Sequence, residues 1–401
     1  MFRFTSTPRR QLAAVLSTAL LAVVAACGGG GGDAGSSDSS SAASYSQGAI
    51  SGFGSVIVNG VRWDDSSATV TDDDGVRQTS SALKLGMVIE VDGSSIDHAA
   101  GSGRALAIRY GSEMLGPVAS IDASLSTVTV LGQTVAVTTS TVFDASIAGG
   151  LAGLSVGAVI EVHGLYDAAN SRTVATRIEL KAGATEYRLR GSISGLDTTA
   201  KTFSIGSELI SYASAGEIPA TLANGTQVKV RLQTTQSAGA WVASKLRLIK
   251  RVFEDRPDAE VEGVITAWTS ATDFEVNGLK VDASKASFPD GQAAIVLGAR
   301  VEVEGAVVAG VLVATKVDLE DDGHHGGPLR EFELHGLIAN LDTAAKTFAL
   351  RGLTVSYAGA VIVNKDGSAA SVSLANGAKV EVKGALSLDL TAIVASSIKF
   401  E

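Results

Sequence analysis

Carboxylates and imidazoles stand side by side between residues 318 and 325, where the sequence reads Asp-Leu-Glu-Asp-Asp-Gly-His-His. Carboxylate oxygens and imidazole nitrogens are donors that bind transition metals. The candidate ligands are Asp321, Asp322, His324 and His325. The stretch is rich in Gly and Asp, and a loop of this kind offers little that would orient the two imidazoles. We therefore favour a solvated linker over a metal site, and we expect no cofactor.

A second group of acids, Asp72-Asp73-Asp74 followed by Gly75, resembles part of a calcium loop. An EF-hand loop places its ligands at alternate positions and ends on a glutamate, which this sequence does not do. The pattern is better explained as a hairpin turn whose acids are exposed to solvent.

Charge is distributed unevenly along the chain. Residues 188–251 carry nine basic and three acidic side chains, a formal charge of +6, whereas residues 257–322 carry four basic and thirteen acidic ones, a charge of −9. The basic region could hold an anionic partner such as lipopolysaccharide or a polysaccharide, or the two regions could pack on each other. We favour packing, because they are neighbours in the chain. The candidate anion-binding residues are Arg188, Arg190, Lys229, Arg231, Lys245, Arg247, Lys250 and Arg251.

The elements that must position these groups belong to one small unit that occurs five times. Each copy begins with a glycine followed two places on by Val or Ile, at Gly48, Gly116, Gly191, Gly263 and Gly336. A second glycine follows in each copy, at Gly86, Gly157, Gly225, Gly298 and Gly377. Each copy ends on Ala-x-x-aliphatic, as in Ala105 to Ile108. Three landmarks that recur five times indicate duplication.

Alternation of apolar and polar residues within each copy predicts β-strands. In Phe274-Glu275-Val276-Asn277-Gly278 the Phe and Val point one way, and Gly278 falls where a hairpin would turn. The order in each copy is three strands, a loop or single helical turn, then two strands. We predict an all-β protein of five tandem small OB-like five-stranded barrels, with a small open sandwich as the alternative for each copy.

The expected organisation begins with a signal peptide and a tether, followed by the five copies. Short boundaries predict that neighbouring copies touch and form a rigid or semi-rigid rod. The expected ranges are 1–26 for the signal peptide, 27–46 for the Gly/Ser tether, and 47–111, 112–183, 186–251, 257–322 and 329–401 for copies one to five.

Glu90, Glu161, Glu302 and Glu381 occupy equivalent positions in four copies. Paired carboxylates can do acid–base work, but each of these is alone in its own copy, on the side opposite the valines. We expect them on a solvated face. The histidines His98, His163 and His335 are isolated in sequence, so we expect no enzyme; a hydrolase with a site between copies is the remaining catalytic alternative.

Tandem G-x-I, G-F-G-S-V-I-V-N-G-V-R-W and L-x-x-G-M-V-I-E-V-x-G patterns fill residues 48–93. They resemble the bacterial DUF5666 domain, found in lipoproteins of Gram-negative bacteria. The likeness covers nearly all of the chain after the tether and weakens in the third copy, where Val228-Lys229-Val230-Arg231-Leu232 lacks the usual Glu and the closing Gly. The family is uncharacterised, so the resemblance implies an architecture and an envelope location, and no activity.

The first 26 residues read as a secretion signal, with Arg3, Arg9 and Arg10 before a short apolar run. Val24-Ala25-Ala26-Cys27 resembles the lipobox of bacterial lipoproteins, in which the cysteine carries the lipid and becomes the first residue. A signal cleaved elsewhere, with Cys27 incidental, is the alternative. The Gly/Ser tract after Cys27 is a flexible tether. By the sorting rule of that class, Gly28 in place of Asp implies the outer membrane, on its periplasmic or surface side.

Composition limits the remaining function classes. With 45 % hydrophobic and 18 % charged residues, the 401-residue chain is not disordered throughout. Its single Cys rules out a disulfide framework. The net charge of −10 argues against a nucleic-acid partner, and three aromatic residues of the third copy, Phe203, Tyr212 and Trp241, are a weak case for base stacking.

These observations predict a non-enzymatic lipoprotein of the cell envelope that acts as a spacer or interaction module. It would contact the membrane through its N-terminal lipid and an envelope glycan or protein through its copies. The alternative is a protein that binds a glycan or lipopolysaccharide with its basic third copy.

Overall fold

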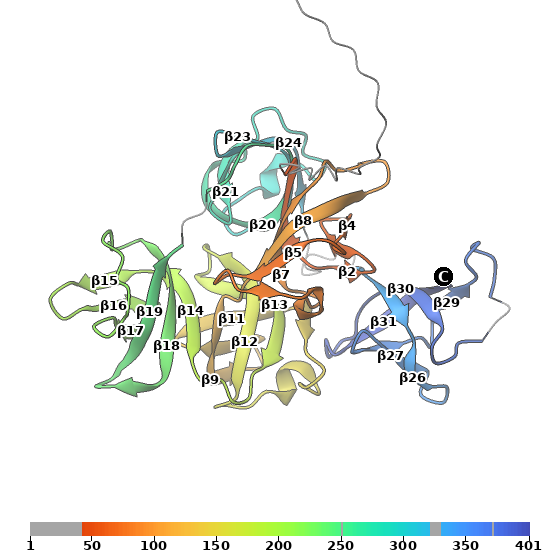
Figure 1. Ribbon diagram of the computed structural model, residues 1–401, viewed down its shortest axis with the longest axis horizontal. Helices are drawn as coiled ribbons and strands as arrows, with labels where there is room; N and C mark the ends of the chain where they lie inside the picture. The colour runs from red at the N-terminus through yellow and green to blue at the C-terminus, as the bar shows by residue number, and fades with distance from the viewer. Residues whose placement is uncertain (1–41, 250–251, 321–329, 371–372) are drawn as a thin grey trace, which may run out of the picture. The chain divides into compact units, whose positions relative to one another are not determined.

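Strands account for nearly all the regular structure of the protein, seen here in a computed structural model that describes residues 42–249, 252–320, 330–370 and 373–401 (Figure 1). The predicted helical turn is a 3-10 helix in three copies: η1 (Ser80–Ala82), η2 (Gly150–Gly153) and η3 (Gln292–Ala294). Within these ranges, no helix is long and apolar enough to cross a lipid bilayer. Cys27 and the metal candidates Asp321, Asp322, His324 and His325 lie outside the described residues.

The second copy is a closed five-stranded barrel. Its hydrogen-bonded ladder runs from β9 through β10, β11, β13 and β12 back to β9, and only the β11–β13 pair is parallel. A closed ladder of five strands with this crossed order is an OB-type arrangement. The strands are β9 (Met114–Asp122), β10 (Thr127–Val130), β11 (Gln133–Phe143), β12 (Val159–Asp167) and β13 (Arg172–Leu180).

The fourth copy closes in the same way, and Figure 1 shows its strands curled into a ring. The ladder runs β20, β21, β22, β24, β23 and back to β20, again with one parallel pair, β22–β24. The strands are β20 (Arg256–Ser270), β21 (Asp273–Val276), β22 (Leu279–Asp282), β23 (Arg300–Val308) and β24 (Val311–Leu319).

In the third and fifth copies, the first strand is split in two by one buried residue, Ile193 or Ile338. The first half pairs with the fourth strand and the second half with the second strand. The third copy contains β14 (Tyr187–Ser192), β15 (Ser194–Asp197), β16 (Thr202–Ile205), β17 (Glu208–Ser211), β18 (Gln227–Ser237) and β19 (Ala240–Leu248). The fifth contains β25 (Phe332–Leu337), β26 (Ala339–Asp342), β27 (Thr347–Leu350), β28 (Leu353–Ser356), β29 (Val361–Val363), β30 (Lys379–Leu386) and β31 (Ala392–Phe400).

The first copy has the most fragmented strands. Its ladder runs β1, β7, β8, β4, β3 and β2, and the hairpin of β5 and β6 is added beside β8. The strands are β1 (Ser44–Ala49), β2 (Gly52–Phe53), β3 (Val56–Val58), β4 (Val61–Asp64), β5 (Thr69–Asp72), β6 (Arg77–Gln78), β7 (Val88–Gly93) and β8 (Ser102–Tyr110).

The glycine that opens each copy is needed because the chain crosses itself closely there. A Cβ at Gly191 would lie 2.4 Å from Cγ2 of Ile205, and one at Gly263 would lie 2.2 Å from the amide of Asn277. Both contacts come from the end of the second strand, where the hairpin turns. The predicted hairpin glycines Gly60, Gly132, Gly278 and Gly352 all have positive φ, between 67° and 81°.

Inward-facing residues follow the predicted alternation. The second strands contribute pairs such as Phe203 and Ile205 or Phe274 and Val276, all at most 2 % exposed. The sequence led us to expect five separate cores, but the described residues form three hydrophobic clusters. Copies one and five share one, copies two and three share another, and copy four has a third, to which Tyr45 of copy one also belongs.

Contacts between copies are also not limited to chain neighbours, contrary to the expected rod. Strand β14 pairs with β9 of the preceding copy, but β1 pairs in parallel with β20 and β2 with β25. Paired strands bring the apolar ends of two copies together, which explains the shared clusters.

Glycine in the fourth strand marks a β-bulge, and this predicts a stability effect. The ladder shifts register at Gly384, where a Cβ would lie 2.2 Å from the carbonyl oxygen of Val394. We expect Gly384→Ala to lower the free energy of unfolding by about 1–3 kcal/mol, since the strands must move apart. Urea unfolding of the full chain measures this.

Gly359→Ala in the same copy is the control, because a Cβ there would meet nothing within 4 Å. Equal stability of the two variants would contradict a steric role for the bulge glycine.

Candidate functional site: a charged three-stranded face

In the third copy, three adjacent strands turn one side inward and the other outward. Leu189 of β14, Val230 of β18 and Leu246 of β19 lie opposite one another in the ladder and are buried. Because side chains alternate along a strand, the residues on either side of each of these point outward. All six are basic.

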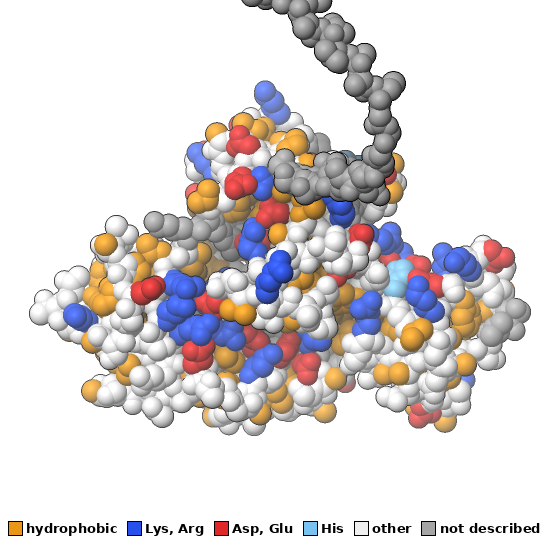
Figure 2. All heavy atoms as spheres, in the orientation of Figure 1, with side chains coloured by type: hydrophobic (Ala, Val, Ile, Leu, Met, Phe, Trp, Pro, Cys, Tyr) orange, Lys and Arg blue, Asp and Glu red, His pale blue; other side chains and the backbone are white. Residues whose placement is uncertain are grey.

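We call these six residues the basic face. They form two rows across the strands: Arg190, Lys229 and Arg247 in one, and Arg188, Arg231 and Lys245 in the other. Figure 2 shows Lys and Arg side chains gathered over the region of β14 and β18, with Asp and Glu side chains at the edge of the group. Like charges directly opposite on neighbouring strands repel each other, so this surface requires anions.

Two of those anions are Asp73 and Asp74, at the tip of the β5–β6 hairpin of the first copy. Asp73 lies 2.5 Å from both Arg190 Nη2 and Lys229 Nζ. Asp74 pairs with Arg231, lies 3.2 Å from Lys229 Nζ, and lies 3.4 Å from Arg247 Nη1. Burial would raise the pKa of the Asp74 carboxyl, but hydrogen bonds from Arg231 and Lys229 outweigh it and hold the pKa at about 2.

The structure has the hairpin turn that the sequence predicted, but the prediction that its acids are exposed to solvent is wrong. Asp72 accepts hydrogen bonds from the amides of Asp74 and Val76, and Gly75 has a φ of +81°. The side chains of Asp73 and Asp74 are only 13 % and 7 % exposed, because the basic face covers them.

Other acids border the basic face. Glu113 contacts Arg190 at 3.3 Å, Glu161 contacts Arg188 at 3.3 Å, and Glu186 contacts Arg231 at 2.6 Å. Glu161 was expected on a solvated face but is 7 % exposed and is also paired with Lys181. Lys250 and Arg251 lie outside the described residues.

These partners differ from those that the chain order suggested. The acids on the basic face come from copies one, two and three, whereas packing against copy four was expected. The aromatic residues Phe203, Tyr212 and Trp241 are buried in the core of the third copy, so they do not present ring faces for stacking.

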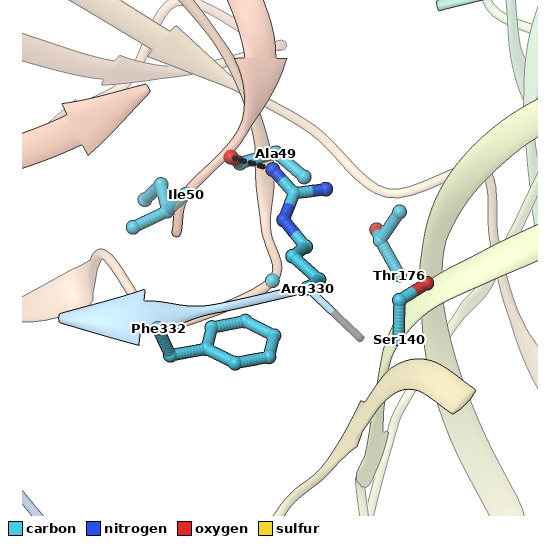
Figure 3. A pocket seen from close by; sticks show the side chains of 7 residues that line it. Ala49, Ile50, Ser140, Thr176, Arg330 and Phe332 are labelled. Carbon is cyan, nitrogen blue, oxygen red and sulfur yellow. Dashed lines mark hydrogen bonds between the residues drawn. The ribbon is translucent and has the colours of Figure 1, made fainter. Parts of the chain in front are cut away.

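The corresponding surface of the fourth copy is acidic. Glu260 and Glu262 of β20 lie directly opposite Glu304 and Glu302 of β23. We call these four residues the acidic face. Arg330, which precedes β25, donates from Nη1 to Glu262 at 2.9 Å and from Nη2 to the carbonyl oxygen of Ala49 at 3.2 Å (Figure 3). Burial opposes ionisation of Glu262, but Arg330 and Arg300 lower its pKa to about 2.

The other acids of this face are not neutralised to the same extent. Burial, with Glu304 and Asp258 nearby, raises the pKa of Glu260 to about 8, although Lys316 opposes the shift. Burial and the neighbouring carboxylates of Glu262 and Glu320 raise the pKa of Glu302 to about 9. Glu302 is therefore not a solvated acid, in contrast to the expectation.

In the fifth copy, the same surface carries three side chains that are close enough together to hold a metal ion. The side chains of Glu333, His335 and Glu381 offer ligand atoms within 4.8 Å of one another. Cations already meet these acids: Arg62 contacts Glu333 at 2.6 Å and Lys383 contacts it at 3.2 Å. The hydrogen bond to Glu333 raises the pKa of His335, which favours an imidazolium over a metal ligand.

The two best-formed cavities of the described residues do not indicate a ligand. The crevice in Figure 3, between Ile50, Arg330 and Phe332, has no room for a water molecule. A wider cleft of about 510 Å³ is lined by Lys84, Arg177 and Arg351, among others. Arg177 is paired with Glu179 and Asp144, and Arg351 donates to the carbonyl oxygen of His335, so the cleft does not single out a ligand chemistry.

Comparison with known proteins identifies the repeated unit. The family model "Domain of unknown function (DUF5666)" matches residues 47–109, 116–179, 262–318 and 335–399, more than half of the chain. The chain belongs to the DUF5666 family. The four matches are DUF5666 copies one, two, four and five. The third copy, in which the sequence likeness was weakest, is unmatched, but its strand pairs recur in the fifth copy, which adds β29 beside β31.

No curated protein matches the sequence. Among solved structures, the chain is similar to one described as "drosophila Unr CSD456", at 13 % identity over 52 % of this chain and 97 % of that one, with a TM-score of 0.15.

Sequence reasoning singled out the basic residues of the third copy but not their partners. Asp73, Asp74 and Glu113 are far from them in sequence, and only the run of three aspartates at a predicted turn could have drawn attention to the hairpin.

The raised pKa values of Glu260 and Glu302 predict a pH dependence. Between the ordinary glutamate pKa and about 8–9, the folded protein holds more protons than the unfolded chain, so stability falls as the pH rises. We expect the urea midpoint to fall between pH 5 and pH 9, and the fall to be smaller in Glu260→Gln/Glu302→Gln.

Glu275→Gln is the matched control, since Glu275 lies on β21, which pairs with β20 and β22. An unchanged pH slope in the double variant would rule out these two groups as its source.

Proposed function

We propose that this protein is a non-enzymatic lipoprotein of the cell envelope, held in the outer membrane by a lipid on Cys27, and that its copies act as interaction modules. The proposal includes five OB-like barrels. The family match to four copies and the shared order of strand pairs in the third and fifth support that count.

One observation carries the interaction role. The same three-stranded outer face carries different charges in different copies: all basic in the third, mostly acidic in the fourth and mixed in the fifth. The inward residues of these strands remain apolar. A constant core with a variable outer face is what a set of recognition surfaces on one scaffold requires.

Some of these faces are used within the chain. The basic face meets the first copy through Asp73 and Asp74, and the acidic face is linked to the fifth copy through Arg330, which precedes β25. Such contacts suit a spacer that keeps its copies together without a disulfide.

The lipid anchor predicts the location of the protein. We expect Cys27→Ser to move it from the membrane pellet to the soluble fraction and to abolish incorporation of labelled fatty acid, since no other residue can accept the thioether-linked lipid. Fractionation with immunoblotting measures the shift.

Ser37→Ala in the tether is the control and should fractionate like the wild type. A Cys27→Ser protein that still pellets and still takes up the label would exclude the proposed anchor.

The basic face favours a second candidate function, binding of a glycan or lipopolysaccharide. Arg247 is 43 % exposed at the edge of this face, so an external anion can reach it. We expect Lys245→Glu/Arg247→Glu to weaken lipopolysaccharide binding at least about tenfold, since each charged hydrogen bond contributes on the order of 1.5–3 kcal/mol. A pull-down with immobilised lipopolysaccharide measures the loss.

Lys201→Glu/Lys365→Glu makes the same change of charge away from β14, β18 and β19 and should bind normally. If both double variants lose binding equally, net charge and not the basic face would be responsible.

A further inference from the structure

The basic face is more cationic than the contact with the first copy requires. Asp73 and Asp74 together meet four of its six cations: Arg190, Lys229, Arg231 and Arg247. Glu113, Glu161 and Glu186 also meet cations of this face, so five carboxylates face six positive charges, and Lys229 is shared between Asp73 and Asp74. A surface built only to hold this hairpin could do so with fewer cations.

The hairpin also leaves the guanidinium groups incompletely satisfied. Asp73 and Asp74 reach Arg190 and Arg231 through Nη2. The Nε atoms of Arg188, Arg190 and Arg231 are buried and, within the described part of the chain, donate to no hydrogen-bond acceptor. An arginine fork presents Nε and Nη side by side and is best satisfied by an anion that takes both. A phosphate group has enough oxygens to do so for neighbouring arginines.

The tip of the hairpin is held less firmly than its first strand, β5, which pairs with β8 at four positions and buries Val70. Strand β6 has two residues, Arg77 and Gln78, and pairs with β5 at two positions. Beside the aspartates, Val76 is 54 % exposed. The contacts of Asp73 and Asp74 with the basic face are ionic, and elements with few apolar contacts are those that open most easily.

We propose that the basic face is a binding site for an anionic ligand that carries two neighbouring phosphate groups, and that Asp73 and Asp74 occupy this site in cis until the ligand displaces them. The inference rests on the second candidate function above and adds the ligand chemistry and the competitor. The two adjacent carboxylates stand where the two phosphates would bind.

The main test compares ligand affinity with and without the internal competitor. The full chain, purified in detergent, is titrated by calorimetry with inorganic tripolyphosphate, with a bisphosphorylated disaccharide and with glucose 6-phosphate. Because the apparent affinity is reduced by the fraction of protein in the closed state, Asp73→Asn/Asp74→Asn should bind the first two at least about tenfold more tightly than the wild type. Glucose 6-phosphate, with one phosphate, should gain less.

The control is Asp342→Asn/Asp366→Asn, which removes the same charge from two turns of the fifth copy. It should bind like the wild type. Adding Lys245→Gln/Arg247→Gln to the Asp73/Asp74 variant should abolish the gain. A gain that is equal in the control, or that survives the loss of Lys245 and Arg247, would overturn the proposal.

A reversible linkage tests whether the hairpin must leave the basic face, with Asp73 still in place as the competitor. In the Cys27→Ser protein, Asp74→Cys and Arg231→Cys are joined by a reducible bifunctional linker, which keeps the hairpin on the face. The linked protein should bind tripolyphosphate at least about tenfold more weakly than the same sample after reduction. Equal binding before and after reduction would show that the hairpin does not control access.

Failure of the second candidate function and failure of the proposed competition give different results. If lipopolysaccharide does not bind but the Asp73/Asp74 variant gains affinity for the bisphosphorylated disaccharide, the second candidate function is wrong in its ligand and the internal competition stands. If lipopolysaccharide binds equally well to wild type and variant, the function stands and the competition is wrong.

Discussion

A barrel of five short strands can give only every second residue to its core. In this protein the inward positions are filled by aliphatic and phenylalanine side chains, such as Phe274, Val276 and Val303, which are almost completely buried. Burial of such side chains contributes roughly 1.5–3 kcal/mol each, so the inward set fixes the fold and tolerates few polar residues. The outward positions are free of that constraint, and this is where the copies differ.

The alternation that fixes the core made much of the fold predictable. The hairpin turns at Gly60, Gly132, Gly278 and Gly352, the buried pairs on the second strands and the single helical turn before the fourth strand all follow from local pattern. Local pattern does not say what covers the outward side. Asp73 and Asp74 lie at a turn and Glu161 lies opposite the inward residues of its strand, so all three would be expected in solvent, but side chains from distant parts of the chain cover them. The shared cores were unpredictable for the same reason, since strand pairs such as β2–β25 join segments nearly 300 residues apart.

The outer face of the first, fourth and fifth strands is charged in copies three, four and five, and each copy accommodates its charges in a different way. In the third copy, six cations attract carboxylates from other parts of the chain. In the fourth, Arg330 and Arg300 hold Glu262 ionised, while the raised pKa values of Glu260 and Glu302 favour protonation instead. In the fifth, cations and anions alternate on the face itself, with His335 between Glu333 and Glu401. Only the third copy depends on anions that it does not itself supply in full.

That dependence makes the contact of the third copy different in kind from the shared cores. Separating two apolar surfaces exposes both to water, with a cost that grows with area. An ionic contact can instead be exchanged, since a second anion restores most of what the first one contributed, and the net change is the difference between two anions. Asp73 and Asp74 are positioned by a short hairpin and leave three buried guanidinium nitrogens without an acceptor. An anion that reaches those nitrogens as well would form hydrogen bonds that the hairpin does not, and the basic face would then favour it over its own aspartates.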